Sequence, residues 1–412
     1  MKEYTFEKSY QMFEQAKQYI PNGIYGPRTP AFLTFGSYPC FLSQGKGSHI
    51  WDVDGNEYID YMCSFGTNII GLCNDEVDDA AREQMSRGNA FTLPSDRWNE
   101  MAEYMINLIS GADWLVFAKN GSDVTTYATT VARAYTGKNK IIVSKGAYHG
   151  SHFWSMPGSI GVPADYYAHT LYFEYNNLDD LKRVIAENKG DVAGIMLTPY
   201  QHAGMGDQIM PAEGFYSELR KICDQENIVL IMDDIRCGFR LNLHGSHCYF
   251  GADPDLICFG KAMGNGYPIS VMTGKESLKN AAASTYFTGT HFFSAVPMAA
   301  SLACMKIIER DGVIEHCSEM GKLMKNEMEQ QAAACNLKVS YTGHPAMPYM
   351  RFVGDDDFSI NRFFCGEAAK RGVFLHPHHN WFISGAHTKG DIEQTLAVTE
   401  ACFKLTADKY FK

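Results

Sequence analysis

The sequence has no long apolar run, no paired cysteines and no surplus of positive charge, and each absence excludes a class of protein. No stretch of the 412 residues approaches the roughly 18 uninterrupted apolar residues that a membrane span needs. The net charge is −11 without a basic stripe, so nucleic-acid binding is not an expected function. The 12 cysteines lie singly, which favours reduced thiols over a disulfide scaffold. Met1 to Tyr4 open directly into a charged amphipathic pattern without a signal-peptide core, so we expect a cytoplasmic protein.

Several familiar site motifs are missing as well. There is no G-x-S-x-G nucleophile elbow, and no G-x-G-x-x-G dinucleotide fingerprint follows an apolar run. Gly260-Lys261-Ala262 lacks the hydroxyl residue and the upstream glycine of a phosphate-binding Walker A loop. His376, His378 and His379 lie close together, but without the cysteine or carboxylate spacing of a zinc site, so no metal is expected.

From about residue 114 onward, short apolar runs alternate with amphipathic stretches. Runs that are apolar nearly throughout, separated by helical patterns, indicate parallel strands buried on both faces. We therefore expect an α/β fold whose polar strand ends lie at the carboxyl edge of the sheet, where open sheets of this kind bind ligands. The runs are WLVFA (114–118), KIIVS (140–144), AGIML (193–197), IVLIM (228–232) and DLICF (255–259).

Both chain ends differ from this central stretch. Residues 6–20 carry apolar residues at helical spacing and stop at Pro21. Residues 49–61 alternate on either side of Asp54-Gly55, which predicts a hairpin. After residue 294 come a long helical stretch, two strand-like segments and an amphipathic tail. We expect a large central domain and a smaller one assembled from both ends.

Three segments that follow the apolar runs carry small polar or aromatic groups. Asn120 to Asp123 precede a helical pattern, where glycine permits close approach, a hydroxyl donates and the helix N-terminus favours an anion. Small polar residues at a helix start are more often plain caps, so this segment alone is not specific for a ligand. Tyr148 is placed to cover one face of a planar ligand, or simply to pack in its loop. Thr288-Gly289-Thr290 places further small hydroxylated residues before another helical run.

Two other strand ends carry charge. Asp233 and Asp234 end an apolar run, and a buried carboxylate needs a cationic partner, which a protonated pyridine nitrogen, an ordinary ion pair or a metal would supply. Lys261 leaves another apolar run, where desolvation lowers its pKa from about 10.4 and makes the neutral amine available for a Schiff base. Taken together, the strand ends describe a phosphorylated aromatic aldehyde, pyridoxal 5′-phosphate (PLP).

From residue 6 to about residue 405 the sequence resembles the class III PLP-dependent aminotransferases, in particular their glutamate-1-semialdehyde aminomutase-like branch. The most specific matches are DDIRCGFR, PDLICFGKAMGNGYP and AYHG. The resemblance implies an α/β protein of PLP fold type I. It implies a large PLP-binding domain with a mainly parallel central sheet over residues 62–293, and a smaller α+β domain from residues 1–61 and 294–412.

The resemblance also implies roles for matching residues at the cofactor. It gives catalysis to Lys261, as the residue bonded to the aldehyde, and to Asp233, at the pyridine nitrogen. The remaining cofactor contacts are phosphate donors and residues that touch the ring. They are Gly121, Ser122, Tyr148, Gln201, Ile235 and Thr290. In the family the residue matching Thr290 acts across a subunit interface, so a homodimer with shared active sites is expected.

On the substrate side, the resemblance implies that Arg28 meets a carboxylate and that Ser64 and Phe65 belong to a family element beside the substrate. We expect His379, Asn380 and Trp381 to shape the same pocket, although core packing explains Trp381 equally well.

The predicted activity is amino transfer between an amino acid, including one whose amine is β or ω, and a keto acid. An aminomutase or an amino-acid epimerase is the alternative, because either uses the same Lys261 chemistry. A catalytically silent PLP-binding regulator is a third interpretation. The segment at residues 376–388 is shorter than that of the aminomutases and lacks their Phe-Glu-Ala, which favours the transferase. Thr198-Pro199 replaces the family's Glu-Pro and so lacks a carboxylate that often pairs with a substrate-side arginine.

Overall fold

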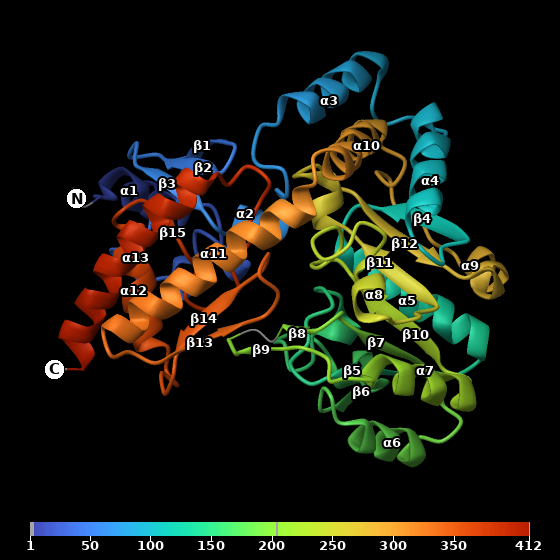
Figure 1. Ribbon diagram of the computed structural model, residues 1–412. Coiled ribbons are helices and arrows are strands. Elements are labelled where there is room, and N and C mark those ends of the chain that lie inside the picture. The colour runs from blue at the N-terminus through green and yellow to red at the C-terminus, as the bar shows by residue number, and fades with distance from the viewer. Residues whose placement is uncertain (1–3, 203–204, 412) are drawn as a thin grey trace. The chain divides into compact units, whose positions relative to one another are not determined.

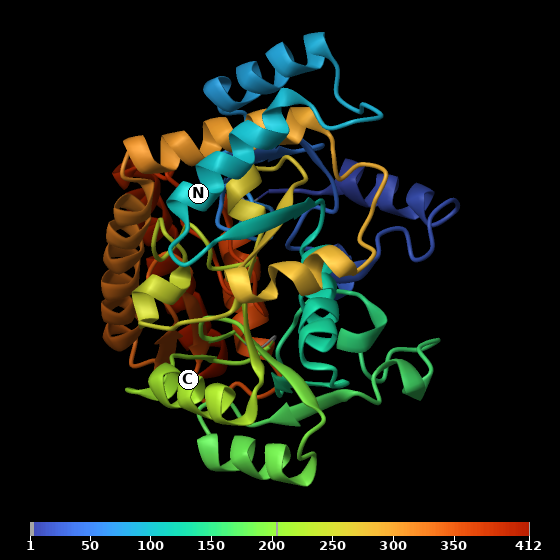
Figure 2. The same ribbon diagram turned by 90° about the vertical axis from the view of Figure 1, so that its right-hand side faces the viewer.

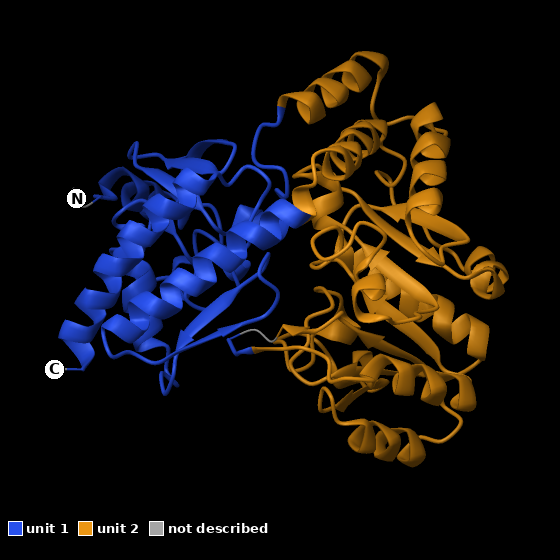
Figure 3. Cartoon of the chain, in the orientation of Figure 1, with its two compact units in different colours: residues 1–74, 205–207, 315–412 blue, residues 75–204, 208–314 orange. Residues whose placement is uncertain are grey.

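A computed structural model describes residues 4–202 and 205–411 of the chain. The chain divides into two compact units, which Figure 3 colours blue and orange. Unit 1 comprises Met1–Asn74, Met205–Asp207 and Glu315–Lys412, and unit 2 comprises Asp75–Gly204 and Gln208–Ile314. Unit 1 is thus assembled mainly from the two ends of the chain. The finer domain limits, 62–293 against the two ends, stay a prediction.

A seven-stranded mixed sheet forms the centre of unit 2, in the order β4-β12-β11-β10-β7-β5-β6 (Figure 1). β12 pairs antiparallel with both of its neighbours, whereas the other pairs are parallel. The five predicted runs are five of these strands and share one direction, so the expected fold class is confirmed. The strands are β4 (Trp114–Ala118), β5 (Lys140–Ser144), β6 (Thr170–Phe173), β7 (Val192–Leu197), β10 (Val229–Asp233), β11 (Leu256–Phe259) and β12 (Ser270–Gly274).

Helices cover this sheet, and α5 packs against it through buried apolar side chains such as Val124, Ala128 and Val131 (Figures 1 and 2). Elsewhere in unit 2, α10 packs against α3 and α4. Between β7 and β10 in the chain, β8 (Gln201–His202) and β9 (Gln208–Ile209) form a separate, small antiparallel pair. The helices are α3 (Asp75–Arg87), α4 (Asp96–Leu108), α5 (Gly121–Thr136), α6 (Leu178–Glu187), α7 (Phe215–Glu226), α8 (Ser246–Phe250), α9 (Lys279–Ser284) and α10 (Ala295–Arg310).

Unit 1 contains a four-stranded sheet in which β15 pairs parallel with β3 and so joins the two ends of the chain. The hairpin predicted around Asp54-Gly55 is confirmed as the antiparallel pair β2–β3. The Asp54 carboxylate accepts hydrogen bonds from the backbone N–H groups of Lys8 and Ser9, both at 2.8 Å, at the start of α1. Because the first N–H groups of a helix lack partners within it, this hairpin caps a helix far away in sequence.

The remaining elements of unit 1 include a second antiparallel pair and the long helices of the C-terminal part. Within the described residues, no helix combines the length and the apolarity needed to cross a membrane. The strands are β1 (Leu42–Lys46), β2 (His49–Asp52), β3 (Glu57–Asp60), β13 (Val339–Thr342), β14 (Tyr349–Phe352) and β15 (Val373–Phe374). The helices are α1 (Glu7–Ala16), α2 (Cys63–Gly66), α11 (Val313–Ala334), α12 (Ser359–Ala369) and α13 (Lys389–Tyr410).

Candidate active site

Lys261 and Asp233 lie at the carboxyl edge of the unit 2 sheet, at the ends of neighbouring parallel strands. Asp233 is the last residue of β10 and pairs in register with Cys258 of β11. Lys261 begins a short 3-10 helix, Lys261–Gly264, two residues after β11 ends, and its φ is +44°. Positive φ is uncommon for a residue with a side chain, so the chain bends sharply where the lysine leaves the sheet.

Desolvation acts on Lys261 as the sequence suggested. Burial and, to a smaller extent, the nearby Arg236 cation lower the pKa of its amine to about 8, although Asp233 opposes both effects. A lysine with such a pKa is neutral in a sizeable fraction of molecules near neutral pH, and only the neutral amine is nucleophilic.

Asp233 is 4% exposed and has an imidazole as its partner. Its Oδ2 lies 2.7 Å from Nδ1 of His149, and its Oδ1 accepts a hydrogen bond from the Ile235 N–H at 3.2 Å. Because a carboxylate only accepts, Nδ1 of His149 donates. No lysine or arginine of the described residues lies within ion-pair distance of Asp233. This buried carboxylate is therefore open to a cation supplied by a ligand.

The adjacent carboxylate, Asp234, has a different environment. It is fully buried, and its Oδ2 accepts a hydrogen bond from the Ser246 N–H at 2.8 Å. Its Oδ1 has no hydrogen-bond partner among the described residues. Burial raises the pKa of Asp234 to about 7. Two neighbouring aspartates thus differ: both oxygens of Asp233 have hydrogen-bond partners, whereas Asp234 has one oxygen without a partner and a raised pKa that favours its neutral form.

The first turn of α5 brings Gly121 and Ser122 to the same edge. The Asp123 carboxylate accepts a hydrogen bond from the Asn120 N–H at 2.8 Å, which fixes where the helix starts. A Cβ on Gly121 would lie 3.1 Å from the Ile235 side chain, and a Cβ on Gly260 would also lie 3.1 Å from it. Ile235 therefore lies between the segment that carries Ser122 and the residue that precedes Lys261.

The other predicted cofactor residues lie in loops. Gln201 is 4% exposed, and its amide is fixed because Oε1 accepts from Ser144 Oγ at 2.6 Å and Nε2 donates to the Lys145 carbonyl at 2.7 Å. Tyr148 is 56% exposed in the loop after β5. Thr290 is exposed between α9 and α10, and its hydroxyl bonds to no described residue, so the single chain does not link it to this cluster.

Sequence reasoning gave no role to two buried histidines of this region. His149 was visible only as the neighbour of Tyr148, and its bond to Asp233 joins residues that are far apart in the chain. His202 follows Gln201 and is 5% exposed. Burial, followed by the Arg236 and Lys261 cations, holds the pKa of His202 well below its usual value, so this imidazole is neutral. Nothing in the local sequence pattern signals either environment.

Three of the predicted substrate residues come together within unit 1. Residues 63–66 form a left-handed turn, with φ of +43°, +51°, +59° and +86°, a conformation that costs roughly 1–2 kcal/mol for each residue with a side chain. It places the Phe65 ring 5.2 Å from the His379 ring, centroid to centroid, and 4.9 Å from the Arg28 guanidinium. Ser64 belongs to the same turn, and its carbonyl accepts a hydrogen bond from Thr67 Oγ1 at 2.8 Å.

Asn380 and Trp381 bond within their own loop. Trp381 is fully buried, and its Nε1 donates to the His376 carbonyl at 3.0 Å. Asn380 Nδ2 donates to the Trp381 carbonyl at 2.9 Å. This geometry favours the packing role of Trp381 over the substrate role. In the described residues, no cluster of three or more His, Cys, Asp or Glu side chains is arranged to hold a metal ion, the neighbouring histidines included.

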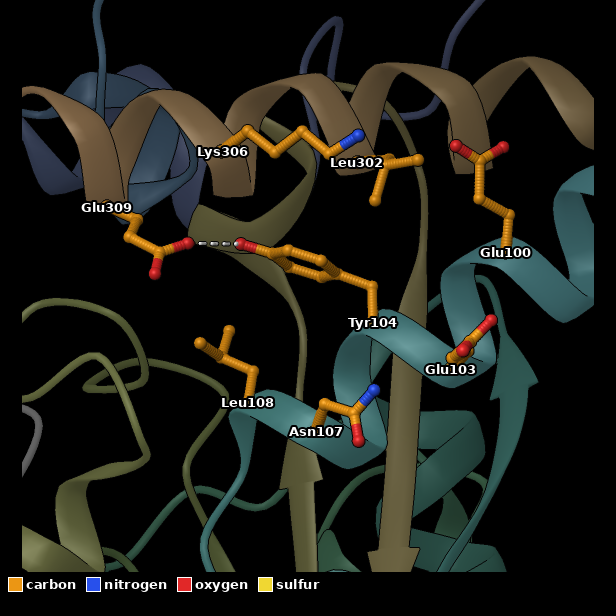
Figure 4. Close-up of a pocket in the computed structure, with 8 residues that line it drawn as sticks. All are labelled: Glu100, Glu103, Tyr104, Asn107, Leu108, Leu302, Lys306 and Glu309. Carbon is orange, nitrogen blue, oxygen red and sulfur yellow. Dashed lines mark hydrogen bonds between the residues drawn. The ribbon is translucent and has the colours of Figure 1, made fainter.

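Unit 2 also has a surface pocket between α4 and α10, away from the sheet edge (Figure 4). Its lining is acidic, with Glu100, Glu103 and Glu309 around Lys306, and Tyr104 donates its hydroxyl to Glu309 at 3.2 Å. None of the predicted cofactor residues lines it, so we do not assign the predicted chemistry to this pocket.

The chain matches the family described as Aminotransferase class-III over residues 34–387, most of its length. The chain belongs to the class-III aminotransferases. Members of this family use PLP, so the expected family, enzyme class and cofactor are confirmed.

Named relatives of this aminotransferase agree with that assignment. It is 37% identical over 390 residues to the aminopentol aminotransferase of Sphingopyxis macrogoltabida, covering 95% of this chain and 92% of the relative. It is 37% identical over 394 residues to the 3-aminobutyryl-CoA aminotransferase of Cloacimonas acidaminovorans, covering 94% and 95%. A glutamate-1-semialdehyde 2,1-aminomutase of Desulforamulus reducens is 31% identical over 430 residues, covering 98% and 99%.

Solved structures agree as well. The PLP internal aldimine form of the FumI protein of Sphingopyxis sp. MTA144 matches with a TM-score of 0.96 and 36% identity, covering 98% of this chain and 97% of that one. The residues at the sheet edge fit PLP. Asp233 is buried without a lysine or arginine partner, Lys261 has a lowered pKa, and Gly121 and Ser122 begin a helix whose N-terminus favours a phosphate.

Proposed function

We propose that the enzyme transfers the amino group of a substrate whose amine is not on the α-carbon to a keto acid, and that Lys261 and Asp233 are its catalytic residues. The observation that carries the catalytic part is the lysine of lowered pKa and the buried carboxylate at the ends of adjacent strands. The 3-aminobutyryl-CoA aminotransferase supports the substrate class, because its named substrate has the amine on the third carbon.

When bound, PLP supplies an aldehyde that condenses with amines and a ring that withdraws electrons from the carbon bearing the amine. Lys261 would hold the cofactor through its neutral amine, and the same amine, once the substrate's amine has replaced it, would move a proton to and from the substrate carbon. Asp233 keeps a proton on the pyridine nitrogen, because a carboxylate beside it stabilises the positive charge. His149 donates to Oδ2 of Asp233, and the Ile235 N–H donates to Oδ1, so the two bonds together fix the orientation of the carboxylate.

The remaining predicted contacts have narrower roles in the proposal. Ser122 and Gly121 would bind the phosphate, Ile235 and Tyr148 would contact the ring, and Gln201 would meet its 3-hydroxyl. The fixed amide of Gln201 suits that role, because its orientation is set before any ligand arrives.

Arg28 is our proposed anchor for an anionic group of the substrate. Its guanidinium lies over the Phe65 ring, and it forms no ion pair with any described carboxylate. An arginine held over an aromatic face keeps its N–H groups available, and the planar fork binds a carboxylate in bidentate fashion. His379, at the edge of the same ring, would border this anchor.

We further propose that the enzyme is a cytoplasmic homodimer in which Thr290 completes the phosphate site of the partner subunit. Support comes from the exposed Thr290 hydroxyl, which has no hydrogen bond to any residue that the structure describes, and from the singly placed cysteines, which suit a reducing compartment.

An isomerase remains the second candidate, because the aminomutase relative covers nearly the whole chain. One experiment separates the two. Purified holoenzyme is mixed with single amino donors, with amines at the α, β or ω position, and with or without a keto acid. Loss of the visible cofactor band with release of a ketone or aldehyde, and turnover only when a keto acid is present, supports the transferase. Turnover without a keto acid, with the amino group retained, supports the isomerase. Preference for α-amino donors contradicts the substrate class.

A further inference from the structure

The loop after β5, which contains His149 to Ser151, is hydrogen-bonded to residues at both ends of the proposed cofactor site. The N–H of Ser151 donates to Ser122 Oγ at 2.9 Å, and Thr125 Oγ1 donates to the His149 carbonyl at 2.7 Å. His149 in turn donates to Asp233. The same short loop therefore contacts the residue proposed for the phosphate and the residue proposed for the pyridine nitrogen.

Gly150 makes the approach of this loop to α5 possible. Its φ is +115°, which side chains disfavour. A Cβ at this position would lie 2.5 Å from Ser122 Oγ and 2.9 Å from Ser122 Cα. Both distances are far below van der Waals contact, and the second is to backbone. Any other residue at position 150 must push the loop and the first turn of α5 apart.

The bond from Ser151 also determines what the Ser122 hydroxyl can do. Since Ser122 Oγ accepts from the Ser151 N–H, its own proton is not used in that bond and is free to donate. The hydroxyl of Ser151 is 3.5 Å from Ser122 Oγ, too far to compete strongly for that proton. A phosphate oxygen in front of the helix is then the natural acceptor.

We propose that Gly150 is a positioning residue for the cofactor phosphate. It allows the Ser151 N–H to reach Ser122 and thereby aims the Ser122 hydroxyl at the phosphate. The inference rests on the phosphate role proposed for Ser122, and it adds a residue that touches neither phosphate nor ring.

Gly150→Ala is the direct test, and Gly158→Ala is its matched control. Gly158 lies in the same segment with φ of +77°, and a Cβ there meets nothing within 4 Å, so this variant has the backbone strain without the collision. We expect G150A to weaken PLP affinity about 10-fold or more, as loss of a hydrogen bond to a charged group does, and to shift the ³¹P resonance of the bound phosphate. G158A should change neither. Equal behaviour of the two variants overturns the inference.

Ser122 variants separate this inference from the proposed phosphate role. If Gly150 acts through the Ser122 hydroxyl, S122A weakens PLP binding. Adding G150A to S122A then weakens it little further, because both substitutions remove the same hydrogen bond from Ser122 to the phosphate. Additive losses overturn the role of Gly150 and leave that of Ser122 intact. Unchanged PLP affinity in S122A contradicts the proposed phosphate role itself.

Folding of the G150A apoprotein is measured separately by thermal unfolding. If G150A is insoluble, G150A/S122G is compared with it, since Ser122→Gly removes the Oγ and Cβ that the new methyl group meets at 2.5 and 3.0 Å, and a glycine at position 122 lets the backbone move away from the remaining contact with Cα at 2.9 Å. Recovery of soluble protein supports the collision with Ser122. Insolubility of both variants, while G158A and S122G fold, overturns it.

Discussion

The sheet edge of unit 2 and the loop at residues 376–383 of unit 1 both gather buried polar side chains, yet they use them differently. In the loop, polar groups bond to the loop's own backbone, as Trp381 does to the His376 carbonyl. At the sheet edge, buried atoms such as His149 Nε2, His202 Nε2 and Asp234 Oδ1 have no partner among the described residues. Burial and residue type are alike in the two regions, and the loop has such an atom as well, His378 Nδ1. What distinguishes the sheet edge is that its unmet hydrogen-bonding capacity lies near a lysine of lowered pKa, which is why we propose the ligand site there.

The largest effect that tests this comparison is expected at Lys261. Lys261→Ala should lower the rate of amino transfer by about 10⁴-fold, because it removes the group proposed to hold the cofactor and move the proton. Lys119→Met is the control, since burial lowers the pKa of Lys119 to about 8 as well and its Nζ has no partner in the described residues. Steady-state kinetics of both variants, with PLP in excess, makes the test. An active K261A enzyme contradicts the assignment.

The neighbouring aspartates provide the next test. Asp233→Asn should lower the rate about 10²- to 10³-fold, because the cationic nitrogen would face a neutral amide in a buried site. Asp234→Asn should stay within about 10-fold of the parent enzyme, because Asp234 bonds to the Ser246 N–H and not to His149. The rates of both variants are compared at one pH with saturating donor. If D234N proves the more damaging substitution, the two carboxylates have been assigned the wrong way round.

Asp234 also predicts how stability depends on pH. Its pKa is raised to about 7 in the folded protein, so between pH 4 and 7 the native state keeps a proton that the unfolded chain has released. Stability from this group is therefore complete at low pH and falls as pH rises, by at most about 1.4 kcal/mol per pH unit. Denaturant unfolding of the apoprotein at several pH values should show a steeper decline in the parent than in D234N. Parallel curves contradict the raised pKa.

A smaller effect is expected at His149. His149→Ala removes the donor to Asp233 Oδ2 and should lower the rate, or PLP affinity, about 10-fold or more. His149→Asn keeps an N–H near the position of Nδ1 and should restore most of that loss. Rates and PLP dissociation constants are measured for both variants. If the asparagine variant is no better than the alanine variant, the hydrogen bond is not what His149 contributes.

The smallest predicted effect lies in the loop of unit 1. Trp381→Phe removes the bond to the His376 carbonyl and should cost about 1–3 kcal/mol of stability, because that carbonyl is left without its partner. KM for the amino donor should hardly change. The unfolding temperature and the KM are measured for the same variant. A large rise in KM without loss of stability would contradict the packing role and support a substrate-binding role for Trp381.

The sequence predicted the sheet, and it placed candidate residues at the ends of its strands, because both depend on local patterns. Five apolar runs became strands of one sheet, and the charged residues that follow two of them came to lie on neighbouring strands. The antiparallel direction of β12 was not predicted, because an apolar run carries no sign of its direction. The left-handed turn at residues 63–66 was not predicted either, since residues with side chains disfavour that conformation and only surrounding packing enforces it.

The sequence also could not predict contacts between residues that lie far apart in the chain. The bond between His149 and Asp233 joins residues 84 positions apart, and the approach of Gly150 to Ser122 depends on where the loop after β5 meets α5. Residue type and position in the sequence identified Asp233, Ser122 and Lys261 as candidates. The groups that position Asp233 and Ser122, namely His149 and Gly150, could be found only in the folded chain.

The central claim is that Lys261 carries the cofactor, and reductive trapping tests it most directly. The holoenzyme is treated with borohydride, which makes a lysine–cofactor bond permanent, and the modified peptide is located by mass spectrometry. The account predicts one modified lysine, Lys261, with loss of modification in K261A and full retention in the Lys119→Met variant. Modification of Lys119 or another lysine in the native enzyme, or no modification at all, would contradict it.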